Sequence, residues 1–159
     1  MSSYKAKPLD KIDLAILNTV QKSGRISNVE LSKIVNLSAS PCLDRVKRLE
    51  VEGYIERYGA YLNAEKLKYG MTAFIQVTLN RTTADIFSKF KIEVVKIKEV
   101  VECHMVAGGF DYLLKLRFEN MASYRKILGA IVELPAVSQT HTYVVTEQVK
   151  QDQGIPILS

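Results

Sequence analysis

Residues 27–53 read SNVELSKIVNLSASPCLDRVKRLEVEG, the pattern of two short helices with three residues between them. Ser27 and Glu30 have the S-x-x-E spacing of a capping box, which opens a helix by satisfying its first free amides. The residues at 35–37 interrupt the helical period. Ser38 is placed to cap the second of the two helices, Pro41 suits its first turn, and Gly53 suits its end.

A further helix precedes this stretch. Asp10 can cap it, Ser23–Gly24 should end it, and its buried side is predicted to contain Ile12, Ile16, Leu17 and Val20. For the two helices that follow, the spacing predicts that the buried residues are Val29, Leu31 and Ile34, and then Leu43, Val46 and Leu49. Residues 54–62, YIERYGAYL, favour a small β-ribbon or wing.

From Met71 onward the hydrophobic period changes to two, as in strands. The pattern predicts strands near 71–80, 100–106, 112–119 and 137–149, with helices at 84–98 and around 124–131. This β-α-β-β-α-β order is that of a ferredoxin-like domain. The sequence therefore predicts an α+β protein with a winged helix-turn-helix domain at 1–62, a linker at 63–70, a ferredoxin-like domain at 71–150 and a mobile tail at 151–159.

Composition excludes several classes of protein. With 159 residues, 47% hydrophobic and 25% charged, the chain is unlike a disordered one. No apolar run approaches the roughly 20 residues that cross a bilayer, and the start of the chain lacks the apolar block of a secretory signal. Two cysteines, Cys42 and Cys103, make neither a disulfide framework nor a four-ligand zinc site. We expect an intracellular protein with no metal, no cofactor and no membrane partner.

Positive charge is concentrated near the front of the chain. The net charge is +5, and residues 22–48 contain six basic and two acidic residues, a local net charge of +4. The helix that begins at Ser38 would enter a major groove of DNA. Its first turn contains Ser40 and Cys42, and its expected outer face contains Asp44, Arg45, Lys47 and Arg48; Arg25 is placed to contact phosphate. The alternative is a three-helix bundle with a solvated basic face.

Catalytic chemistry has little support. Cys103 and His104 are neighbours in a strand, so their side chains should point to opposite faces, and His141 lies in a different strand. Gly108–Gly109 joins two strands and lacks the lysine of a phosphate loop. It is either a plain hairpin turn or a place where open amides receive a carboxylate while Asp111 faces an ammonium group.

Five segments together resemble the Lrp/AsnC family of transcription regulators, and most closely its leucine-responsive branch. They are LDKIDLAILNTVQKSGRISNVELS, LSASPCLDRVKRLEVEGYIERYGAYLN, ECHMVAGGFDYLLKLR, MASYRKILG and THTYVVTEQVK. The match extends from about Leu9 to Lys150. It implies a DNA-binding winged helix-turn-helix and an effector domain that binds a small molecule, usually an amino acid such as leucine, between C-terminal domains. It also implies double-stranded DNA as a partner, dimers that pack sheet on sheet, assembly into octamers, and a cytoplasmic, nucleoid-associated bacterial protein.

The resemblance also assigns residues. The recognition-helix pattern S-x-[ST]-P-C-x-x-R-V is matched from Ser38 to Val46, and the implied DNA-binding residues are Arg25, Ser27, Asn28, Ser38, Ser40, Pro41, Cys42, Arg45, Lys47 and Arg48. The effector loop G-x-[FY]-D is matched at Gly108, Phe110 and Asp111, with Gly109 where many members have an acidic residue. The implied effector residues are Met105, Gly108, Gly109, Phe110, Asp111, Met121, Tyr143, Val144 and Val145.

Two other classes of function remain open at this stage. A ferredoxin-like enzyme of the dimeric barrel type needs a titratable cluster that the sequence does not supply. A global architectural DNA-organising protein would bind DNA with loose sequence preference and little response to amino acids. We therefore predict a sequence-specific, effector-modulated regulator of amino acid metabolism that is not an enzyme.

Overall fold

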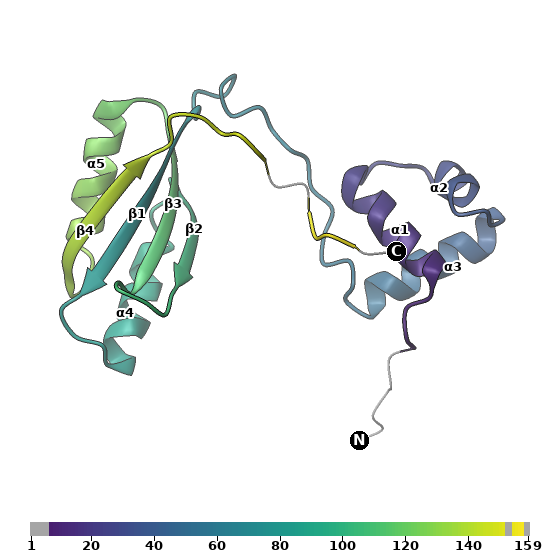
Figure 1. Cartoon of the computed structure of the whole chain (residues 1–159), viewed down its shortest axis with the longest axis horizontal. Coiled ribbons are helices and arrows are strands. Elements are labelled where there is room, and N and C mark those ends of the chain that lie inside the picture. The colour runs from purple at the N-terminus through teal and green to yellow at the C-terminus, as the bar shows by residue number, and fades with distance from the viewer. Residues whose placement is uncertain (1–6, 152–153, 158–159) are drawn as a thin grey trace. The chain divides into compact units, whose positions relative to one another are not determined.

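The computed structural model describes residues 7–151 and 154–157, which fall into two compact units. The N-terminal unit contains the residues up to Tyr61 together with those from Lys150 onward. The C-terminal unit is Leu62–Val149. The first is helical and the second contains the sheet (Figure 1). Residues 1–6 of the predicted first domain lie outside the described residues, as do residues 152–153 and 158–159 of the predicted tail.

Three helices form the N-terminal unit: α1 (Lys11–Lys22), α2 (Asn28–Ile34) and α3 (Ala39–Val51). The predicted caps of the first two are confirmed, since Asp10 and Ser27 both form reciprocal capping boxes, with Asp13 and Glu30. Ser38 is the N-cap residue of α3, but its side chain makes no capping hydrogen bond. Gly53 has a φ of 78°, the left-handed conformation that glycine adopts most readily after a helix.

The core of this unit differs from the predicted one by a small rotation of two helices. Its buried residues are Ile16, Leu31, Val35, Cys42 and Leu49. Val29 and Ile34 of α2 are exposed, and Leu43 of α3 is 40% exposed. Positions 42, 46 and 49 have i, i+4, i+7 spacing and share a narrower stripe of the helix than 43, 46 and 49, so helical spacing itself favoured Cys42 over the larger Leu43.

One prediction about the segments that flank the helices is corrected, that of strands within residues 54–62. Residues 54–62, expected as a β-ribbon or wing, contain no strand; Tyr58 instead donates a hydrogen bond from its hydroxyl to Glu50 of α3 at 2.8 Å. In the tail, which was expected to be mobile, Ile155 exchanges two hydrogen bonds with the side-chain amide of Gln21, at 3.0 and 3.1 Å. A glutamine amide can pair with a peptide group in this way because it offers one donor and one acceptor.

The C-terminal unit has the predicted βαββαβ order. Its elements are β1 (Met71–Leu79), α4 (Ala84–Val94), β2 (Val100–Met105), β3 (Tyr112–Phe118), α5 (Met121–Val132) and β4 (Val137–Val144). The strands form an antiparallel sheet in the order β2-β3-β1-β4, as in a ferredoxin-like fold. β4 ends at Val144 instead of the predicted Val149, where its pairing with β1 stops opposite Ala73; the Val145 amide still donates a hydrogen bond to the carbonyl of Thr72.

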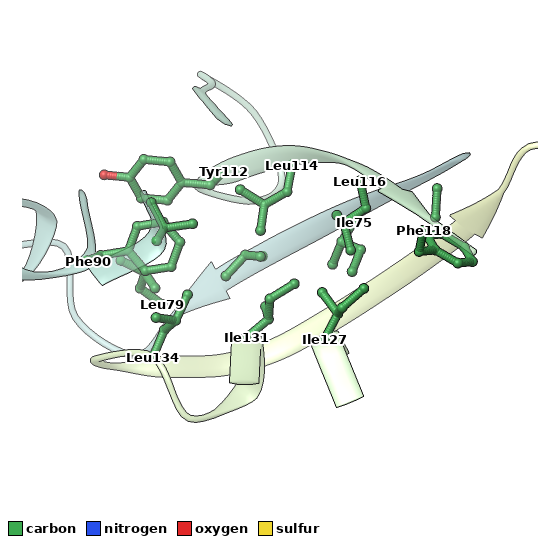
Figure 2. Close-up of a cluster of buried hydrophobic side chains, with 13 residues drawn as sticks. Ile75, Leu79, Phe90, Tyr112, Leu114, Leu116, Phe118, Ile127, Ile131 and Leu134 are labelled. Atoms are coloured by element: carbon green, nitrogen blue, oxygen red, sulfur yellow. The ribbon is translucent and has the colours of Figure 1, made fainter. Parts of the chain in front are cut away.

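Both helices of this unit pack on one face of the sheet. Alternate residues of β1 and β3 are buried against Phe90 of α4 and Ile127 and Ile131 of α5 (Figure 2). The ring of Phe90 stacks on that of Tyr112 with centroids 4.3 Å apart. In the described residues no helix covers the opposite face, which the register shows to contain Phe74, Gln76, Leu113, Lys115, His141 and Tyr143. None of the described helices is long and apolar enough to cross a membrane.

Shortening a buried side chain of this core should destabilise the C-terminal unit alone. For Leu114→Ala we expect a loss of about 2–5 kcal/mol in the free energy of unfolding, because the substitution removes apolar contacts and leaves a cavity. Hydrogen exchange should show faster opening of β1 and β3 and unchanged opening of α1–α3. Ile92→Ala, at a residue 58% exposed on α4, is the control and should change stability by less than about 0.5 kcal/mol. Equal losses in both variants would contradict this core assignment.

Candidate DNA-binding and effector sites

The start of α2 is fastened to the start of α3. The side-chain amide of Asn28 donates a hydrogen bond to the carbonyl of Ala39 at 2.7 Å. The hydroxyl of Ser27 donates to the carboxylate of Glu30 at 2.7 Å and accepts from the Glu30 amide at 3.2 Å. Two residues predicted at DNA, Ser27 and Asn28, therefore also hold together the helix pair that would present α3 to a groove.

The outward side of α3 follows from its core contacts. Cys42 is fully buried, so its thiol lies in the hydrophobic core and is not exposed for the contact with DNA that the resemblance implied. Desolvation raises the pKa of this thiol, which keeps it neutral. The side chains that α3 and its neighbourhood do expose, among those predicted, are Arg25, Ser27, Ser38, Ser40, Pro41 and Lys47.

Arg45 and Arg48 are engaged inside the protein. One guanidinium nitrogen of Arg45 lies 2.6 Å from Asp10 and 2.7 Å from Asp13, and Arg48 lies 2.5 Å from the other oxygen of Asp13. The side chain of Asp13 is fully buried, while those of Arg45 and Arg48 are 26% and 23% exposed. We call these four residues the Asp13 cluster. It joins the first turn of α1 to the middle of α3.

The Asp13 cluster keeps its carboxylates ionised. Burial by itself raises the pKa of Asp13, but hydrogen bonds from Arg48, the Asp10 amide and Arg45 outweigh it, so the pKa is lowered. The Asp13 amide and the Arg45 side chain lower the pKa of Asp10 from 3.8 to about 2. Because a buried carboxylate needs charged partners, the two arginines have a structural role in addition to any role at DNA.

The effector residues predicted near the β2–β3 hairpin lie at one end of the sheet. The carboxylate of Asp111 accepts a hydrogen bond from the Leu79 amide at 2.7 Å, and the Asp111 amide donates to the carbonyl of Val77 at 3.0 Å. These bonds fasten the Gly108–Asp111 turn to the end of β1. Met105, at the end of β2, is paired with Tyr112 and is exposed.

The other predicted effector residues lie at the opposite end of the sheet. Val144 and Tyr143 pair with Ala73 and Phe74 near the start of β1, and Val145 donates a hydrogen bond to the carbonyl of Thr72. Met121 begins α5, three residues after Phe118, which pairs with Met71. At about 3.4 Å per residue, β1 separates the two groups by about 20 Å. One chain therefore does not bring them together around one small ligand.

Sequence reasoning missed Asp10 and Asp13 as partners of α3. Asp10 was identified as a cap of α1, and neither acid lies within the basic stretch 22–48. The sequence did contain a signal for this cluster. Two carboxylates stand three residues apart at the start of one predicted helix, and two arginines stand three residues apart, at 45 and 48, on another helix of the same predicted bundle. In the part of the chain that the structure describes, no three His, Cys, Asp or Glu side chains gather where they could hold a metal ion.

Comparison with known proteins gives matches over both units. Residues 9–56 match a family model described as winged helix-turn-helix DNA-binding, and residues 72–155 match one described as the Lrp/AsnC ligand binding domain. The leucine-responsive regulatory proteins of Escherichia coli K12 and Klebsiella pneumoniae are 53% identical over 152 residues, which covers 95% of this chain and 93% of each relative.

Solved structures agree. A Neisseria meningitidis transcriptional regulator in complex with L-Met superposes with a TM-score of 0.89 at 37% identity, covering 94% of this chain and 97% of that one. An AsnC family regulator from Agrobacterium tumefaciens has a TM-score of 0.89 at 26% identity, covering 93% and 97%.

Acid should unfold the N-terminal unit through the Asp13 cluster. The folded-state pKa values of Asp10 and Asp13 are depressed, so their contribution to stability is complete above about pH 4 and is lost as the pH falls toward 2. Asp13→Asn should cost about 3 kcal/mol at pH 7, because it leaves two arginines without their shared charge, and should flatten the acid dependence. Urea unfolding followed by helical circular dichroism between pH 7 and 2.5 measures both.

The matched control for this prediction is Asp85→Asn, which removes a carboxylate from an exposed ion pair with Lys89 in the other unit. It should leave the acid dependence of α1–α3 unchanged. An Asp13→Asn protein with the acid dependence of the wild type would show that the cluster does not stabilise the unit.

Proposed function

The chain belongs to the Lrp/AsnC family of transcriptional regulators, and on that premise we propose which of its residues contact DNA and which receive its effector. It is a DNA-binding regulator with an effector-binding domain, and its homologues are regulators and not enzymes.

We propose that α3 enters the major groove and that Arg25, Ser38, Ser40 and Lys47 make polar contacts with the DNA. The observation that supports this most directly is that Ser38, Ser40 and Lys47 lie at the exposed side and N-terminal end of a helix whose opposite side is buried. Arg25 is exposed three residues before Asn28, which bonds to the start of that helix. Ser27, Asn28, Arg45 and Arg48 set the orientation of that helix. Pro41 shapes its first turn, and Cys42 acts from the core.

The effector in this proposal is an amino acid with an apolar side chain, such as leucine. Two relatives are named for their response to leucine, and one similar structure contains L-Met. The amides of Gly108 and Gly109 would meet the carboxylate, Asp111 the ammonium group, and Met105 and Phe110 the apolar part.

An interface site would explain the separation of the predicted effector residues. Met121, Tyr143, Val144 and Val145 can approach the Gly108–Asp111 turn only from another copy of the chain. We propose a dimer formed through the uncovered sheet face, where Phe74, Leu113 and Tyr143 lie, and further assembly of dimers into octamers.

Two copies of α3 related by a two-fold axis would contact half-sites about 34 Å apart. The setting is the cytoplasm, in association with the nucleoid.

Binding of the effector would act by favouring one assembly or conformational state over another, since a ligand can shift such an equilibrium only through different affinities for the two states. The regulated genes would be those of amino acid metabolism. The hairpin turn is a suitable sensor because its Asp111 carboxylate already fixes the end of β1, so a ligand at Asp111 is coupled to the sheet.

DNA binding by the full chain should weaken steeply as salt rises, because each phosphate contact releases counterions. Arg25→Ala should lower affinity for all sequences alike and reduce the slope of log K against log salt by about one. The charge-matched control is Arg125→Ala, on the exposed face of α5, which should keep the wild-type slope. An Arg25→Ala slope equal to that of the wild type would remove Arg25 from the interface.

Leucine and methionine should raise the melting temperature of the wild type, since a ligand at about 100 times its dissociation constant adds about 2.7 kcal/mol. Asp111→Asn keeps an oxygen to accept the Leu79 amide but loses the charge, so it should fold and bind these amino acids at least about tenfold more weakly. Asp85→Asn is the control and should bind as the wild type does. Unchanged binding by Asp111→Asn would remove this carboxylate from the site.

A further inference from the structure

The outer side of α3 exposes the carboxylate of Asp44, which has no structural role within the described residues. Opposite the buried Cys42 and Leu49, helical geometry places Ser40, Asp44 and Lys47 on the most exposed line of α3, and all three are exposed. No ion pair or side-chain hydrogen bond of the described chain involves Asp44. It lies beyond the first turn, so it does not cap the helix either.

Arg45 and Arg48, which the sequence alone favours for base contacts, point away from the outer side of α3. On a helical wheel, Arg45 and Arg48 project to one side of the core line, toward α1, and both bind the buried carboxylate of Asp13 at 2.5–2.7 Å. Moving either one to a base would remove one of the two charged partners of the buried Asp13, which is costly. The side chains that remain for contact with base edges are those of the outer line.

We propose that Asp44 is a specificity-determining residue, whose carboxylate accepts a hydrogen bond from the exocyclic amino group of a cytosine in the major groove. The inference rests on the proposed function, in which α3 occupies that groove. The N4 amino group of cytosine is the only hydrogen-bond donor that a C·G pair presents in the major groove. An aspartate carboxylate is a suitable acceptor for it. Asp44 also lies in the N-terminal half of the helix, the part that contacts base edges in this motif.

The neighbours of Asp44 fit this role. A lone carboxylate is repelled by the phosphate backbone, so it contributes discrimination and not general affinity. Lys47 lies three residues along the same line and compensates that charge. Ser40 lies one turn earlier, where a hydroxyl can bond to a base edge or to phosphate.

Selection of bound duplexes from a randomised DNA pool, using the full chain, tests the proposal. The wild type should enrich a motif with a cytosine at one position of each half-site. Asp44→Asn should change that position to adenine, because an amide pairs with N6 and N7 of adenine, and should shift the base preference there by about tenfold. Asp44→Ala should lose preference at that position while keeping the rest of the motif.

Glu56→Gln is the matched control, since it removes one exposed carboxylate from the same unit without touching α3. It should enrich the wild-type motif. If Asp44→Asn and Asp44→Ala bind DNA and both enrich the wild-type motif at every position, Asp44 does not determine specificity and the inference is wrong. If the wild type itself enriches no motif, it is the sequence-specific function that fails, which distinguishes the two failures.

Discussion

The orientation of α3 depends on one buried carboxylate. Asp13 is out of contact with solvent and is satisfied by two arginines of α3 and by the amide of Asp10. A charge in that position is stable only if its partners stay in place, so the cluster fixes the rotation of α3 about its own axis. The same rotation puts Cys42 in the core and the line of Ser40, Asp44 and Lys47 at the surface. In our proposal, the Asp13 cluster thus decides which side chains of α3 face the DNA.

The cluster also changes how the charge of the chain should be understood. The stretch 22–48 has a net charge of +4, but two of its six cations are paired with Asp10 and Asp13, which lie upstream of it. The cations of that stretch that form no ion pair within the described residues are Lys22, Arg25, Lys33 and Lys47. A count of charges along a window cannot show this, because ion pairs are formed in space and not along the sequence.

The two groups of predicted effector residues lie at opposite ends of the sheet of the C-terminal unit. At one end, Asp111 bonds the β2–β3 turn to the last residues of β1; at the other, the end of β4 and the start of α5 lie near the first residues of β1. Because both helices cover the same face, the opposite face and both ends of the sheet stay accessible within a single copy. This one-sided construction suits a domain whose ligand is held between copies, as we propose.

Sequence by itself determined the succession of elements, the capping boxes at Asp10 and Ser27, and the strands of the sheet. These depend on local spacing, which repeats every few residues and is visible in a linear pattern. Tertiary structure decided the partners of α3: Arg45 and Arg48 pair with Asp13, about thirty residues away along the chain, in the same rotation that buries Cys42. It also decided where β4 stops, because the pairing of β4 with β1, which ends opposite Ala73, is formed between segments far apart in the sequence.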